Sequence, residues 1–263
     1  MPSLISQQDL RSVRNLSFCY LCGHGWDERP VDHDHVPPKS LFDEKDRDRP
    51  LKLKTHKDCN NRHSDSSDKL MSQFIALLEG RPKKLDRLRL SSHEVGSDSP
   101  IVAVEWFPFR QIVARFLKGF HAALYWEYLQ DGHMLLVHEP FPGGERPGQD
   151  TILYPEQREA FATEIKANRM ARTIDTVLTY NGKCRYECVW SELDDGRPIC
   201  IFALDIYHWD KHVDPNRYPE RGCVGFYAAP NGNVPDRATR KTRIIFPISY
   251  REPFNPFEEI SHH

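Results

Sequence analysis

"FCYLCGHG" (residues 18–25) and "LKTHKDCNNRHS" (residues 53–64) are the two stretches that decide how the first part of the chain folds. Each holds two metal-competent side chains separated by two residues, Cys19 and Cys22 in the first stretch and His56 and Cys59 in the second. A gap of two residues lets a tight turn present both donors to one ion, and three thiolates with one imidazole can form a tetrahedral zinc site. The spacing therefore predicts a structural Zn²⁺ ion held by these four side chains.

Residues 1–95 differ from the rest of the chain because they combine short polar runs with most of the metal-competent side chains. A module of this size with few large apolar residues has little core of its own and needs a staple. The small polar segment "SSHEVGSDSP" (residues 91–100) marks the expected boundary. We therefore predict two domains, residues 1–95 and residues 96–263.

The second part shows the patterns of an α+β domain. A long amphipathic helix is expected after Pro108 and a second helix after Pro155, and a shorter helix is expected within residues 64–80 of the first part. Alternating apolar runs separated by turn residues indicate strands of an antiparallel sheet. These runs cover residues 133–141, 183–190, 198–209, 223–230 and 242–250. We therefore predict an α+β protein.

The chain has seven cysteines, an odd number, and its start lacks the apolar centre of a secretory signal. Cysteines in such a chain are more often ligands or reduced buried thiols than disulfides. Because no apolar run approaches the roughly 20 residues that cross a bilayer, we expect a cytoplasmic protein without a membrane partner. Four cysteines lie in apolar runs where buried thiols are common, namely Cys184, Cys188, Cys200 and Cys223.

The segment "VDHDHVPPKSLF" (residues 31–42) lies between the two halves of the predicted zinc site. Within it, only His35 is followed by a proline three residues later and a serine five residues later, namely Pro38 and Ser40. With the Cys-x-x-Cys pair before it and His56-x-x-Cys59-Asn60 after it, the stretch from Phe18 to Ser64 resembles the HNH endonuclease family. The resemblance implies two strands and a helix, a ββα-metal domain, built around one catalytic cation.

The resemblance also implies roles for particular residues. It makes His35 the general base and Asp34 a ligand of a catalytic Mg²⁺ or Mn²⁺ ion, whereas Asp32 and His33 lead into that pair. Asn60 would be a second ligand, and His63 a third ligand or a contact to the phosphate. The family's middle Asn has no counterpart in "DRDRPLKLK" (residues 46–54), so we expect Asp48 or a backbone carbonyl to orient His35.

Phosphodiester hydrolysis suits this set of residues. It needs a base with a pKa near the working pH and a cation held by oxygen ligands. We therefore expect a metal-dependent DNA endonuclease, with host defence as a plausible setting. Two alternatives stay open, an inactive zinc-stapled DNA-binding or adaptor module and an RNA-cleaving toxin of the same metal chemistry.

Any nucleic-acid binding must rest on a local patch, because the formal net charge is −2. The expected contacts to the DNA backbone are basic side chains beside the site and in the segment "RPKKLDRLRL" (residues 81–90), and the alternative is a solvated helix face. They are Lys39, Arg62, Arg81, Lys83, Lys84, Arg87 and Arg89. The second domain is expected to read DNA, to form a homodimer or to bind a regulatory partner.

Overall fold

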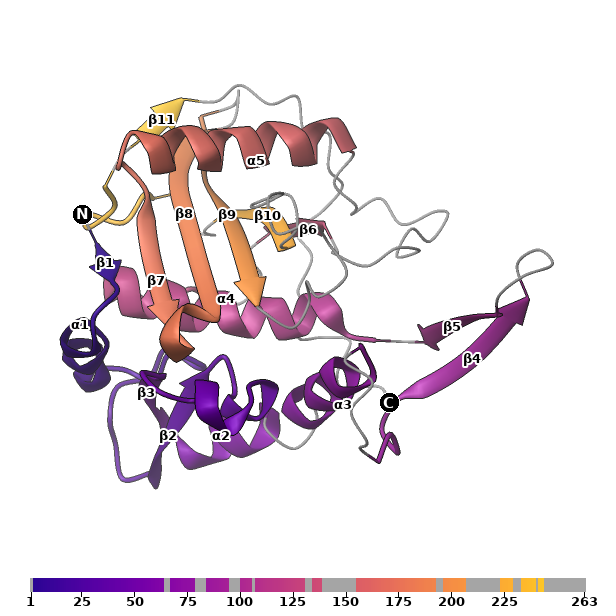
Figure 1. Ribbon diagram of the computed structural model, residues 1–263. Helices are drawn as coiled ribbons and strands as arrows, with labels where there is room; N and C mark the ends of the chain where they lie inside the picture. The colour runs from indigo at the N-terminus through magenta and orange to yellow at the C-terminus, as the bar shows by residue number, and fades with distance from the viewer. Residues whose placement is uncertain are drawn as a thin grey trace.

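The computed structural model describes residues 2–63, 67–78, 84–94, 100–105, 107–130, 134–138, 155–192, 196–206, 223–228, 233–239 and 241–243. These residues form a mixed α+β protein, as the sequence predicts (Figure 1). None of the helices within these ranges has both the length and the apolar character that a membrane span requires.

A seven-stranded sheet dominates the second part of the chain. Its strands follow the order β1-β7-β8-β9-β10-β6, and β11 pairs with β8. All pairs are antiparallel except β1 with β7 and β11 with β8. The bounds are β1 Ser3–Leu4, β6 Met134–His138, β7 Asp175–Thr179, β8 Cys184–Glu192, β9 Pro198–Ile206, β10 Cys223–Ala228 and β11 Lys241–Arg243. Five of these strands lie within or overlap predicted runs, whereas β1 and β7 were not expected.

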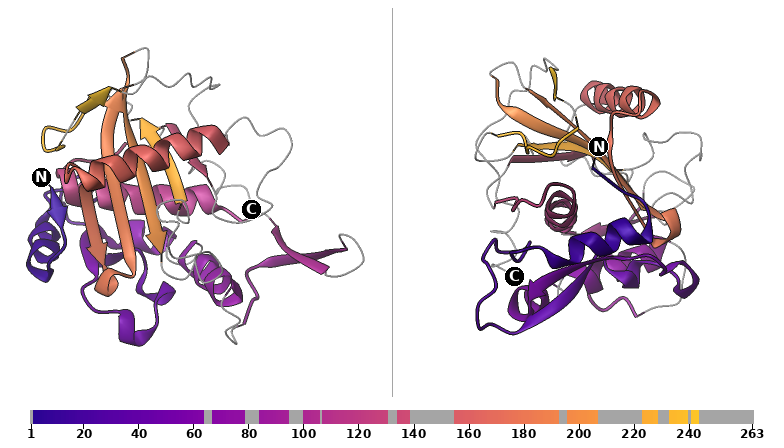
Figure 2. Two further views of the ribbon diagram at one scale, coloured as in Figure 1. Left: turned by 45° about the horizontal axis from the view of Figure 1, so that its top comes forward. Right: turned by 90° about the vertical axis from the view of Figure 1, so that its left-hand side faces the viewer.

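Two helices cover opposite faces of this sheet, α4 (Phe109–Tyr125) and α5 (Pro155–Met170) (Figure 2). The first was predicted from its apolar periodicity, and the second was predicted as a helix opened by Pro155. Successive residues of a strand point to opposite sides of a sheet. The strands of this sheet carry apolar residues on both of these faces. On one side, Phe161 and Ile165 of α5 pack against Val189, Ile201 and Phe226. The predicted buried thiols are confirmed, and all four are fully buried in the sheet.

A ββα unit lies on the far side of α4 (Figure 2). Its strands β2 (Val31–Val36) and β3 (Leu51–His56) form an antiparallel hairpin, and α2 (Lys57–His63) follows directly. The hairpin connection contains two 3₁₀ turns, η2 (Lys39–Leu41) and η3 (Glu44–Asp46).

Shorter elements surround the unit. They are α1 (Gln7–Ser12) with the 3₁₀ turn η1 (Val13–Asn15), α3 (Lys69–Leu78), and a separate two-stranded ribbon of β4 (Arg89–Glu94) and β5 (Pro100–Glu105). The helix expected within residues 64–80 corresponds to α3.

The two parts of the chain share one buried core. Strand β1, from the start of the chain, pairs with β7 of the large sheet. Tyr180, in the 3₁₀ turn η5 (Tyr180–Gly182), stacks on Phe42 at 4.0 Å between ring centroids and donates a hydrogen bond to the carbonyl of Pro37. The largest cluster of buried apolar residues therefore spans both sides of residue 95, and a division into two domains there stays a prediction.

The contact between α4 and β2 leaves no room for a side chain at Gly119. A Cβ atom at this position would lie 2.7 Å from Cγ1 of Val36. In an open helix, Gly→Ala adds up to about 1 kcal/mol of stability, whereas overpacking a core costs about 1–3 kcal/mol.

We expect Gly119→Ala to lower the free energy of unfolding by about 1 kcal/mol in urea denaturation, because the overpacking outweighs the gain in helix propensity. The same change in a Val36→Ala background removes the two closest contacts, those to Cγ1 and Cγ2, and leaves Cβ of residue 36 at 3.2 Å, so its cost should be smaller. A stabilising effect of Gly119→Ala in the native background would contradict this packing.

Candidate metal centre and hairpin site

The four predicted zinc ligands lie together. The ligand atoms of Cys19, Cys22, His56 and Cys59 all lie within 4.8 Å of one another, although residues 23–55 separate the two pairs. The first pair sits on a tight turn in which the N–H of Gly23 donates to the carbonyl of Cys19 at 2.8 Å. Gly23 has φ +75°, a conformation that glycine adopts without steric cost. The cluster can bind a structural metal such as zinc.

The second pair comes from the junction between β3 and α2. His56 is the last residue of β3, and Cys59 lies in the first turn of α2. The Nδ1 atom of His56 lies 3.3 Å from Sγ of Cys22, whereas its Nε2 atom lies 3.7 Å from a carboxylate oxygen of Asp27. Nδ1 therefore faces the other three ligand atoms, whereas Nε2 is buried and makes no hydrogen bond to a described residue. Trp26 packs edge-on against the ring at 5.3 Å.

The thiols of this cluster differ in acidity. Burial disfavours the thiolate of Cys22, but hydrogen bonds from His24 and His56 outweigh it and lower the pKa of Cys22 to about 6. Burial and the neighbouring Cys19 thiolate raise the pKa of Cys59 to about 12. A divalent cation would favour the ionised form of every thiol, so metal binding should release protons.

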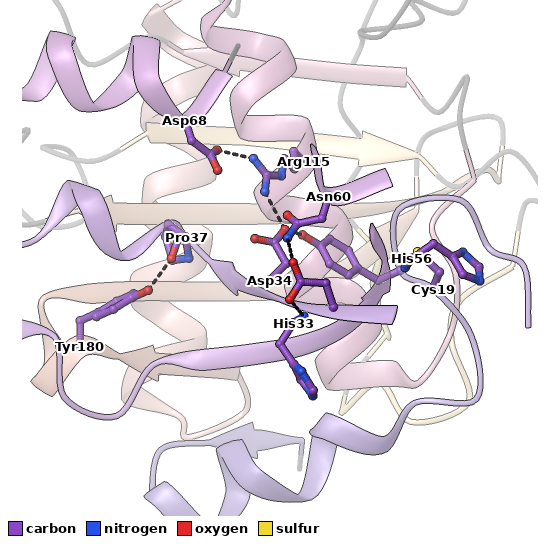
Figure 3. A network of polar contacts seen from close by, with 11 residues as sticks. Cys19, His33, Asp34, Pro37, His56, Asn60, Asp68, Arg115 and Tyr180 are labelled. Carbon is purple, nitrogen blue, oxygen red and sulfur yellow. Dashed lines mark hydrogen bonds and ion pairs between the residues drawn. The ribbon is translucent and has the colours of Figure 1, made fainter. Parts of the chain in front are cut away.

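The register of the hairpin sorts the site residues onto two faces. His35 pairs with Lys52, and Asp34 pairs with Leu53. Because neighbouring residues of a strand point to opposite faces, Asp34 faces the helices, whereas His35 lies on the other face with Lys52. His33 shares the face of His35, and Figure 3 shows it pointing away from Asp34.

Asp34 is buried in a network of charged and polar groups (Figure 3). Its Oδ2 atom accepts hydrogen bonds from the hydroxyl of Tyr20 and from Nη2 of Arg115, the latter at 2.6 Å. Burial and the charge of Asp34 raise the pKa of Tyr20 well above its usual value, so the phenol keeps its proton and donates it. The other branch of the Arg115 guanidinium pairs with Asp68.

Asn60 lies on α2 beside the same face of the hairpin. Its Nδ2 atom donates to Oδ2 of Asp32 at 3.2 Å (Figure 3), and its Oδ1 atom is buried and has no hydrogen-bond partner. A buried carbonyl oxygen without a donor is costly. Carboxylate and amide oxygens are the ligands that Mg²⁺ and Mn²⁺ prefer. Asp34, Asn60 and Asp32 carry oxygen atoms of this kind. Among the described residues, however, Cys19, Cys22, His56 and Cys59 are the only group of three or more His, Cys, Asp or Glu side chains whose ligand atoms converge.

His35 carries a neutral imidazole whose pKa lies below the near-neutral value expected of a general base. Burial lowers its pKa to about 4, and the positive charges of Lys52 and Lys39 act in the same direction. The imidazole is therefore neutral at physiological pH and has a lone pair available. Lys39 is exposed and Lys52 is partly buried. Both place a positive charge near the His35 side chain.

The remaining predicted residues are only partly assembled around this site. Arg62, Arg87 and Arg89 are exposed, and the exposed Lys84 pairs with Asp86 at 3.2 Å. His63 ends α2, but its side chain lies outside the described residues, as do Arg81 and Lys83. Asp48, which we expected to orient His35, instead accepts a hydrogen bond from Asn181 at 3.5 Å.

The sequence predicted no role at the site for five of its residues, and only two of them had a signal. The polar pairing of Lys52 with His35 follows from the hairpin register, and Asp32 stands two residues before Asp34 on the same face. Tyr20, Asp68 and Arg115 gave no signal, because only tertiary packing brings them to Asp34.

No protein-family model matches the sequence, no curated protein matches it, and no solved structure matches its fold.

Proposed function

We propose that this chain is a metal-dependent endonuclease of the HNH type that hydrolyses phosphodiester bonds in DNA. One observation carries the proposal. Strand β2 presents a neutral histidine on one face, His35, and a carboxylate on the other, Asp34, with the amide of Asn60 beside that second face. Base and cation ligands thus flank a single strand.

This arrangement suits an in-line displacement. The attacking water and the leaving oxygen must lie on opposite sides of the phosphorus atom, roughly in line. A phosphate at the exposed edge of β2 would have His35 on one side, where its imidazole accepts a proton from the attacking water. The other side would face the oxygen atoms of Asp34 and Asn60. A divalent cation held there supplies charge neutralisation for the phosphate and its leaving oxygen.

The basic groups near His35 support binding of a polyanion. Lys52 lies directly opposite His35 in the hairpin, and both Lys52 and Lys39 are close enough to depress its pKa. Their ammonium groups would contact the phosphates on either side of the cleaved bond. Because such contacts reach the backbone and not the base edges, we expect cleavage with limited sequence preference.

The first test is plasmid nicking by Asn60→Ala. We expect the zinc-loaded wild-type protein to nick supercoiled DNA with Mg²⁺ or Mn²⁺ and to stop in EDTA. Asn60→Ala should lose about 100-fold in rate, because it removes a cation ligand and so part of the charge stabilisation of the transition state.

The matched control is Asn61→Ala, which truncates the neighbouring exposed asparagine on the same helix and should change the rate by less than about threefold, as expected for a surface substitution. Zinc content measured by elemental analysis should be equal in all three proteins. Equal nicking by Asn60→Ala and wild type would refute the assigned cation site. Labelled RNA offered in the same assay separates DNA cleavage from RNA cleavage.

One observation favours a second candidate, an inactive zinc-stapled DNA-binding or adaptor module. The carboxylate of Asp34 is already compensated by a guanidinium, as a purely structural ion pair would be. DNA binding in gel-shift assays, without cleavage in Mg²⁺, Mn²⁺ or Zn²⁺, would support this candidate over the nuclease.

A further inference from the structure

Arg115 reaches into the hairpin site from outside the ββα unit. It lies on α4, and its side chain is 2% exposed. Its guanidinium is held at both branches, by Nη2 to Asp34 and by Nη1 to Asp68. Burying a charged group is costly unless charge and hydrogen bonding compensate it, and here two carboxylates do so.

The contacts of Asp34 are unevenly divided between its two oxygens. Arg115 and Tyr20 both donate to Oδ2. Among the described residues, no donor contacts Oδ1 of Asp34. The carboxylate is thus fixed through one oxygen, and the second oxygen is left for another ligand. In metal sites, the carboxylates that bind the ion commonly accept hydrogen bonds from neighbouring groups, and these bonds fix their orientation.

Asp68 adjusts the charge of this arrangement. A guanidinium paired with Asp34 alone would leave a neutral pair, which has no net charge to attract a divalent cation. With Asp68 on the other branch, the group of two carboxylates and one guanidinium keeps one net negative charge. Burial raises the pKa of Asp68 to about 6, and the charge of Arg115 opposes this rise. Because this pKa is still below neutral pH, the carboxylate is mostly ionised there.

We propose that Arg115 is a positioning residue of the catalytic cation site. Together with Tyr20 it orients Asp34 so that Oδ1 binds the cation, and Asp68 offsets the positive charge that this orientation brings. The inference rests on the proposed function, because it assigns partners to the same cation site. It also gives α4 a role in the hairpin site, since α4 supplies the guanidinium.

Lysine cannot replace arginine in this role. The planar guanidinium has several N–H donors in a fixed fork and contacts Asp34 and Asp68 through separate nitrogens. An ammonium group is a compact point charge, and it would pair with one carboxylate and leave the other unfixed. Arg115→Lys therefore keeps the charge and removes the geometry.

The test is a titration of the full, zinc-loaded chain with Mn²⁺, followed by the loss of the electron paramagnetic resonance signal of the free ion. This reads cation binding without any cleavage. We expect Arg115→Lys, Asp68→Asn and Tyr20→Phe each to weaken Mn²⁺ binding, by roughly 10-fold or more for the first two.

Tyr180→Phe is the matched control for Tyr20→Phe. Each change deletes one buried, hydrogen-bonded hydroxyl, but the hydroxyl of Tyr180 donates to the carbonyl of Pro37, directly after β2, and not to Asp34. Tyr180→Phe should keep the wild-type affinity for Mn²⁺, even if it lowers the unfolding temperature. A role confined to stability would lower the unfolding temperature of the three site variants and leave their Mn²⁺ affinity unchanged.

The outcomes separate this inference from the proposed function. If wild-type protein binds Mn²⁺ at a site that Asn60→Ala abolishes, and the three site variants bind it equally well, the positioning role is overturned and the nuclease proposal stands. If wild-type protein has no Mn²⁺ site that depends on Asn60, both proposals are overturned. Weakening in the three variants, with Tyr180→Phe unaffected, supports the inference.

Discussion

Chelation of the metal at Cys19, Cys22, His56 and Cys59 is expected to unfold the hairpin and α2 while the large sheet persists. The four ligands join the turn at residues 19–22 to the junction of β3 and α2. Structural zinc contributes about 10–16 kcal/mol of apparent binding free energy in small zinc modules, which is as large as the roughly 5–15 kcal/mol by which a typical domain is stable. Loss of a bound ion should therefore destabilise this part of the chain strongly.

Hydrogen exchange followed by mass spectrometry measures this effect locally. Peptides covering residues 18–63 should lose protection after chelation, whereas peptides from β8 and β9 should keep it. Cys59→Ala should reproduce the loss and should lower the zinc content from about one ion per chain, the content expected for a single four-ligand site, to none.

The matched control is Cys223→Ala, which truncates a fully buried thiol in β10 that belongs to the core and not to the cluster. It should keep its zinc and the protection of residues 18–63. If the hairpin kept its native protection after the metal had been removed by a chelator, metal binding at these four residues would not be needed to stabilise the fold.

Replacement of His35 by alanine is expected to reduce DNA nicking by about 10³-fold, because general-base catalysis by a positioned side chain contributes about 10²–10⁴ in rate. The neutral imidazole, held beside Lys52, is the proton acceptor in the proposed chemistry. Zinc content and hydrogen-exchange protection should stay native, since His35 takes no part in the metal cluster or in the contacts to α4.

His33→Ala is the control for this substitution. His33 lies two residues away on the same strand and face, and it is exposed. Its loss should change the nicking rate by only a few fold. Equal loss of activity in the two variants would show that the histidines act through general electrostatics, and full activity of His35→Ala would remove the base from the proposal.

Local patterns in the sequence were enough to predict much of this structure. The two pairs of the Cys19, Cys22, His56 and Cys59 cluster follow from two short spacings, because two side chains with two residues between them in a turn lie together whatever the rest of the chain does. Helix α4 follows from its apolar periodicity after Pro108, and helix α5 follows from Pro155, which opens it. The apolar runs along β8, β9 and β10 likewise indicate strands, and they are buried on both faces because α4 and α5 cover opposite sides of the sheet.

Tertiary structure decided the rest, because it depends on contacts with no local signature. Strand β7 could not be foreseen as the neighbour of β1, since residues 3–4 are too few to carry a period. The sequence pattern pairs Asp34 with His35 as neighbours, but the pleat places them on opposite faces of the hairpin. Asp34 then meets Arg115, which is 81 positions away along the chain. Such an ion pair is fixed by packing α4 against β2, and no spacing in the sequence records it.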